Sequence, residues 1–112
     1  MGERRWTLEA ARALLPDVRA RTERAWAEAQ AIAAERERHP PESPARREAD
    51  ARAQAVVDRW VREMEALGLE VKGLWLVDFD NGNGYYCWKW PEEELAFFHD
   101  YDEGFEGRTR IQ

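Results

Sequence analysis

Apolar residues recur with the spacing of a helix over residues 6–38. Thr7 stands at the start of this segment and is a suitable N-cap. Pro16 lacks the amide hydrogen that a helix interior uses, so the sequence predicts a kink or a break near residues 14–16. The apolar positions form a heptad-like seam, consisting of Leu8, Leu15, Thr22 and Ala29 with Ala11, Val18, Ala25 and Ile32 between them.

A second helical segment follows a proline-rich loop. Three prolines between His39 and Pro44 cannot continue a helix. The next apolar stripe predicts a helix over about residues 45–67, and Gly68 is a natural residue to end it. Two long helices joined by a short loop pack antiparallel, so we expect a helical hairpin.

From Val71 onward the pattern changes to that of strands. Asn and Gly tolerate positive φ, so the Asn-Gly-Asn-Gly sequence at residues 81–84 is a strong hairpin signal. The strands expected are residues 71–80, 85–90 and 95–101, followed by an irregular tail. The predicted fold class is α+β, with a long antiparallel helical hairpin packed on a three-stranded antiparallel β-meander. We expect one domain over residues 1–112, with its helical half at about 6–67 and its sheet and tail at about 71–112.

Strand parity predicts which residues share a face of the sheet. A tight first hairpin places Asp78 opposite Cys87 and Val77 opposite Trp88. The aromatic face that includes Trp88 is expected to pack on the helices. The other face contains Leu74 and Leu76 as well as Asp78 and Cys87, and it is too apolar to face water alone. A second copy of the chain is the simplest cover, so we expect a homodimer that buries this face or the helical seam.

Charge and composition exclude several classes of protein. Residues 71–112 hold nine acidic residues against four basic ones, whereas residues 1–70 hold 14 acidic residues and 13 arginines. Acidic surfaces repel phosphate backbones, so no nucleic acid partner is expected. No apolar run approaches the roughly 20 residues that span a bilayer, and no signal peptide is present. We therefore expect a cytoplasmic protein without a membrane partner. The low content of Asn, Gln, Cys and Met is typical of thermophiles.

Several segments together carry a family resemblance. They are Gly73–Phe79, Tyr86–Lys89, Phe97–Asp100 and Glu103–Arg108, with Trp6–Ala11 and Leu14-Leu15-Pro16 near the N-terminus. These segments resemble a bacterial family of uncharacterised proteins, the domain of unknown function 2203, over essentially the whole chain. The resemblance implies a shared fold, and it implies no activity because the family's function is unassigned.

The sequence contains no motif of a known catalytic class, whether a phosphate loop, a dinucleotide-binding glycine motif or a nucleophile elbow. Ser43 is the only serine, and it lies in the proline-rich loop. Cys87 and His99 on neighbouring strands could form a nucleophile and base. A thiol in the middle of a strand is buried and inert, however, so we expect Cys87 to be structural.

A metal site is the sharper chemical hypothesis. One histidine with several carboxylates suits iron, zinc or manganese. The candidate ligands are His99, Asp78, Asp100, Glu103 and Glu63. The alternative is a histidine that donates to a carboxylate without any metal. The register between the strands at residues 85–90 and 95–101 decides much of this question. A four-residue turn between them places His99 on the aromatic face, whereas one bulged residue places it on the face of Asp78 and Cys87.

Three functions therefore stay open. The protein is a homodimeric structural or interaction module, or the same module holding one metal ion, or a metal-dependent enzyme with an unknown small substrate. Arg108 is expected to pin the tail by pairing with Asp100, Asp102 or Glu103, or to clamp an anionic ligand.

Overall fold

Two long helices and an antiparallel sheet make up the fold in the computed structural model, which describes residues 5–112. The elements are α1 (Leu8–Arg36), α2 (Pro44–Ala66), β1 (Glu70–Gly73), β2 (Leu76–Asp80), β3 (Tyr85–Lys89), β4 (Phe97–His99), the 3-10 helix η1 (Phe105–Gly107) and β5 (Thr109–Arg110). The predicted α+β class is confirmed. The sheet has five strands in the order β1-β2-β3-β4-β5, so the predicted count of three is wrong.

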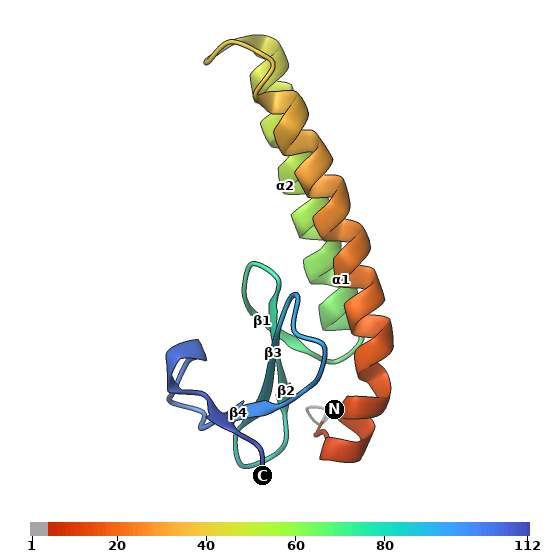
Figure 1. The fold of residues 1–112 in the computed structure, drawn as a ribbon, viewed down its shortest axis with the longest axis vertical. Helices are drawn as coiled ribbons and strands as arrows, with labels where there is room; N and C mark the ends of the chain where they lie inside the picture. Colours follow the sequence, from red (N-terminus) through yellow and green to blue (C-terminus); the bar gives the residue numbers. More distant parts are fainter. Residues whose placement is uncertain (1–4) are drawn as a thin grey trace.

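The helical hairpin is longer than the sheet that it packs on. Figure 1 shows α1 and α2 side by side, with the sheet against only one end of the pair, and the molecule measures 48 × 30 × 25 Å. The outer half of the hairpin is therefore stabilised by helix–helix contacts alone.

The start of α1 and the end of α2 follow the sequence signals. The Thr7 hydroxyl accepts from the Ala10 amide, and the Ser43 hydroxyl caps α2 in the same way. Gly68 has φ +93°, and its amide and that of Leu69 donate back to carbonyl groups in the last turn of α2.

Of the kink or break predicted near Pro16, the break does not occur, because α1 runs through this residue without interruption. Leu15 and Val18 are both buried in the core on either side of the proline. Burying these side chains against α2 and the sheet outweighs the loss of one backbone hydrogen bond.

The predicted strand from Val71 to Asp80 is also wrong, because it is two strands joined by a turn. Trp75 has φ +61°, and β1 folds back to pair antiparallel with β2. The turn carries the Trp75 side chain into the core, where its ring meets that of Trp60 edge-on at 5.0 Å. The tail adds the last strand, since β5 pairs with β4.

The core lies between the helical seam and the aromatic face of the sheet, as the strand parity predicted. Trp60 and Trp88 are fully buried there. The indole N–H of Trp60 donates to the Thr22 hydroxyl at 2.8 Å, and that hydroxyl donates to the Val18 carbonyl at 2.8 Å. The single polar position in the α1 seam is thus satisfied in full.

The tail crosses the opposite face of the sheet and covers part of it. The guanidinium of Arg108 lies 4.1 Å from the ring centres of both Phe97 and Phe105. It also donates to both carboxylate oxygens of Glu92, at 3.1 and 2.8 Å. Arg108 therefore pins the tail as expected, but the predicted pairing with Asp100, Asp102 or Glu103 is wrong. Leu74, predicted to lie on this face, is instead in the turn between β1 and β2 and is 55% exposed.

Candidate metal centre

Three adjacent strands bring together three possible metal-binding side chains beneath the tail. Asp78 on β2 lies opposite Cys87 on β3, as predicted. His99 on β4 lies opposite Tyr85, so it points to the same face as Asp78 and Cys87. Of the two registers left open by the sequence, the structure has the one with the extra residue.

His99 is held by hydrogen bonds on both ring nitrogens. Nδ1 lies 2.8 Å from the backbone carbonyl oxygen of Asp100, and Nε2 lies 3.0 Å from Oδ2 of Asp78. A carbonyl oxygen can only accept, so Nδ1 carries the proton of that bond. With Nδ1 held in this way, a ring that carries a second proton donates from Nε2 to Oδ2 of Asp78, whereas a neutral ring offers the Nε2 lone pair to a metal ion.

Asp78 is a buried carboxylate that is only partly satisfied. Its residue is 1% exposed, and no group within residues 5–112 donates a hydrogen bond to its Oδ1 atom. Burial raises the pKa of the Asp78 carboxyl above its usual value, while the charge of His99 and the Cys87 thiol act in the opposite direction. A buried carboxylate with one free oxygen is the kind of group that a cation would stabilise.

Cys87 completes the cluster. Its sulfur, a carboxylate oxygen of Asp78 and a ring nitrogen of His99 all lie within 4.8 Å of one another. Burial, together with the charge of Asp78, raises the pKa of the Cys87 thiol to about 12. Without a metal ion this thiol is protonated and unreactive, in agreement with the expected structural role.

A pocket of about 290 Å³ opens onto the three donors. Its floor is formed by the cluster, and its walls come from β1, β2 and the tail. The residues lining it are Lys72, Leu76, Asp78, Cys87, His99, Glu103, Gly104 and Phe105. A ligand bound by the cluster would therefore have space on one side only, beneath the tail.

The other residues proposed from the sequence have different positions. Asp100 contributes its backbone carbonyl to His99, while its own side chain is at an exposed position. Glu103 lines the pocket, although it is outside the compact cluster. Glu63 lies on α2, where it pairs with Arg21 at 3.2 Å and Arg59 at 3.9 Å. The structure thus groups two of the five candidate ligands, His99 and Asp78, with Cys87, which was not among the candidates.

Cys87 was omitted because a thiol in mid-strand is ordinarily inert. The sequence did contain the signal that could have included it, since the bulged register places Cys87 beside both other donors. Asp80 shows the contrast on the same strand, because Tyr101 and Arg5 each donate to its carboxylate at 2.6 Å. Those bonds help to hold the pKa of Asp80 below its usual value despite burial, so this carboxylate needs no metal ion.

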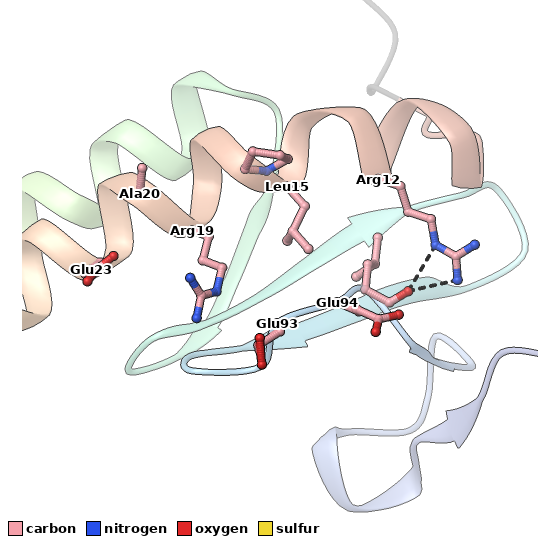
Figure 2. Close-up of a pocket in the computed structure, with 9 residues that line it drawn as sticks. Arg12, Leu15, Arg19, Ala20, Glu23, Glu93 and Glu94 are labelled. Carbon is pink, nitrogen blue, oxygen red and sulfur yellow. Dashed lines mark hydrogen bonds between the residues drawn. The ribbon is translucent and has the colours of Figure 1, made fainter.

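A larger hollow, of about 470 Å³, lies between α1 and the turn before β4. Figure 2 shows Arg12 directed across it to the backbone carbonyl of Leu95, which accepts bonds from Nε and Nη2 at 3.2 and 3.1 Å. Glu23, Glu93 and Glu94 line the same hollow. No member of the cluster lines it, so it is separate from the candidate metal centre.

The fold and the cluster define a small α+β protein, a helical hairpin on an antiparallel sheet with a buried Asp-Cys-His group. The chain belongs to the family described as "Uncharacterized conserved protein (DUF2203)", whose model matches residues 4–111. Comparisons with curated proteins and with solved structures found no significant match. Within residues 5–112, neither helix has an apolar stretch long enough to cross a membrane.

Proposed function

We propose that this protein is a non-catalytic binding module that holds one divalent transition-metal ion through Asp78, Cys87 and His99. The proposal includes a homodimer in the cytoplasm, where a reducing environment would preserve the thiol. The observation that carries it is the buried cluster of three different donors, with a free carboxylate oxygen, at the floor of a pocket.

Charge balance supports a metal ion at this position. An ionised Asp78, a thiolate at Cys87 and a neutral His99 carry two negative charges together, which a divalent cation neutralises. The three side chains and the bound cation together are neutral, and a neutral group is less costly to bury than two isolated anions would be. Coordination also supplies the free energy needed to deprotonate a thiol with a pKa of about 12.

The donor types indicate which metal to expect. A set with sulfur, nitrogen and oxygen donors suits zinc, with iron(II) as the second choice, whereas manganese prefers oxygen-rich sites. The bond from Nδ1 of His99 to the Asp100 carbonyl is the outer contact that holds metal-binding histidines in position. The experiment therefore uses zinc and its spectroscopic substitute cobalt(II).

We expect metal-free protein to bind one equivalent of cobalt(II) with a thiolate-to-cobalt charge-transfer band, and zinc to displace the cobalt. Cys87→Ser should remove that band, and Cys87→Ser, Asp78→Asn and His99→Leu should each lower the zinc affinity by about 100-fold or more, because outer contacts alone are worth about 10- to 100-fold. Zinc affinity is measured by competition with a chromogenic chelator. Elemental analysis of the purified protein identifies the native metal.

Two controls separate the cluster from the wider set of acids. Glu63→Gln and Asp100→Asn change exposed or half-exposed carboxylates outside the cluster, so both should bind zinc as the unmodified protein does. Folded wild-type protein that shows no stoichiometric binding of cobalt or zinc would exclude the proposed function. The alternative, a metal-dependent enzyme, would require a coordination position open to a substrate.

We expect the protein to be a dimer at micromolar concentration in light scattering. The hairpin projects beyond the sheet, and Leu74 is a large, exposed apolar side chain in the turn between β1 and β2. If the sheet face forms the dimer interface, Leu74→Asp should shift the equilibrium toward monomer. If the helices form the interface, Ala27→Asp, on the exposed surface of α1, should shift it instead. A wild-type monomer would contradict the prediction.

A further inference from the structure

Glu103 is positioned to reach the cluster from the tail. It lines the same pocket as Asp78, Cys87 and His99, and its residue is exposed. Its Oε1 accepts from the Asp100 amide at 3.1 Å, while no group within residues 5–112 hydrogen-bonds its Oε2. One carboxylate oxygen of Glu103 is therefore free at the edge of the pocket.

The backbone of Asp100 connects Glu103 to the cluster. Its carbonyl oxygen accepts from Nδ1 of His99 at 2.8 Å and also from the Glu103 amide at 3.1 Å. The same acceptor thus fixes the ring of a cluster member and the backbone of Glu103. The position of the Glu103 backbone relative to the His99 ring is therefore fixed by these two hydrogen bonds to the Asp100 carbonyl.

Gly107 leaves space for the Glu103 side chain. A Cβ atom at residue 107 would lie 3.0 Å from Cβ and 3.2 Å from Cδ of Glu103. Arg108, the next residue, anchors this part of the tail through Glu92 and two phenylalanine rings. Glu103 therefore packs against an anchored segment of the chain, at a point where a larger residue would crowd its side chain.

We infer that Glu103 supplies the fourth ligand and closes the metal site, an inference that rests on the proposed function. Zinc in closed protein sites takes four ligands, and Asp78, Cys87 and His99 supply three. The tail is then the cover of the site, and the site has no position for a substrate. This assigns metal binding, without turnover, to the cluster.

The local charge tolerates a fourth ligand that is an anion, the third anion of the site. A site with three anions and a divalent cation carries one net negative charge. Nη1 of Arg108 lies 4.0 Å from Sγ of Cys87, and Lys72 lines the same pocket. Although these cations also pair with Glu92 and Glu70, their positive charge at the pocket partly offsets the excess negative charge.

The test compares the cobalt(II) and zinc forms of wild-type protein with those of Glu103→Gln. We expect Glu103→Gln to lower the zinc affinity by about tenfold or more while one equivalent still binds. Because its fourth position is then open, added sodium azide should change the cobalt spectrum of Glu103→Gln and leave that of the wild type unchanged. Gly107→Ala should act in the same direction by displacing the Glu103 side chain.

Glu106→Gln is the matched control, because Glu106 is an exposed acid in the same tail that does not line the pocket. It should reproduce the wild-type affinity and its insensitivity to azide. Circular dichroism of each variant establishes that it is folded. If wild-type protein binds no metal, the proposed function itself fails. If wild-type and Glu103→Gln bind zinc equally and respond equally to azide, only the assignment of Glu103 is overturned. A spectral change in both proteins would then indicate an open site, and a change in neither would indicate that another group closes it.

Discussion

His99→Leu is expected to lower the free energy of unfolding of the metal-free protein by about 3–5 kcal/mol at neutral pH, the range for removing one partner of a buried charged pair. Leucine fills a similar volume, so the main loss is the hydrogen bond at 3.0 Å from Nε2 to Asp78. Asp78 is 1% exposed, and its second oxygen already has no partner among the described residues. Chemical denaturation in the presence of a chelator measures the change.

The loss in the free energy of unfolding caused by His99→Leu, here called the deficit, should depend on pH in a defined direction. Burial raises the pKa of Asp78, so the folded protein retains this proton to a higher pH than the unfolded chain does. The free energy of unfolding then falls as pH rises between the two pKa values, because the folded state binds more protons there. Removing the charge of His99 raises the folded-state pKa further. The deficit should therefore be widest at neutral pH and should shrink toward about pH 3, where the carboxyl is mostly protonated in both states because the ordinary pKa of Asp is about 3.9.

A double-mutant cycle provides the control for this prediction. Asp78→Leu combined with His99→Leu should be less destabilising than the sum of the two single changes, because no buried charge is left unpaired. Strictly additive effects, or a His99→Leu deficit that does not vary with pH, would show that the pair is not coupled as described.

Arg108→Ala is expected to cost about 3 kcal/mol, near the lower limit for breaking a buried ion pair, because Glu92 keeps some exposure to solvent. The change removes a two-bond contact with Glu92 and leaves Phe97 and Phe105 without the planar group that lies between them. Arg108→Lys should recover less than half of the loss, since an ammonium group cannot form the paired bonds or stack on the rings.

The loss should be concentrated in the tail. Amide exchange of residues 100–110 should accelerate more than that of the helices, because β5 contacts the rest of the sheet only through β4. Arg110→Ala is the matched control. Arg110 is exposed and lies 5.6 Å from the Phe97 ring, so its removal should change stability by less than about 1 kcal/mol. Equal effects of the two alanine variants would contradict the role assigned to Arg108.

Local signals in the sequence were sufficient for the helices and for the central hairpin. Thr7 and Gly68 act within one turn of the residues that they cap, so their effect does not depend on distant contacts. The Asn-Gly-Asn-Gly turn fixes the pairing of β2 with β3, and with it the contact of Asp78 with Cys87. These features were predicted correctly because a short segment determines each of them.

The errors in the predicted fold all arise from contacts between distant segments. Pro16 is tolerated because the residues beside it are buried by α2 and the sheet. Trp75 adopts a positive φ because its ring packs against Trp60, which lies in another element. Helix and turn propensities do not include these gains in burial, which exceed the cost of one lost hydrogen bond or one strained dihedral.

The sequence by itself determined the fold class, the helical hairpin and the opposition of Asp78 and Cys87, because periodicity, capping residues and turn residues act locally. Only the tertiary structure decided that His99 joins these two residues and that Glu63 does not. The position of His99 depends on the register between β3 and β4, which the intervening turn leaves open by one residue, and a shift of one residue reverses the face of every side chain on a strand. The role of Arg108 was decided in the same way, because its partner Glu92 is brought near by the return of the tail across the sheet.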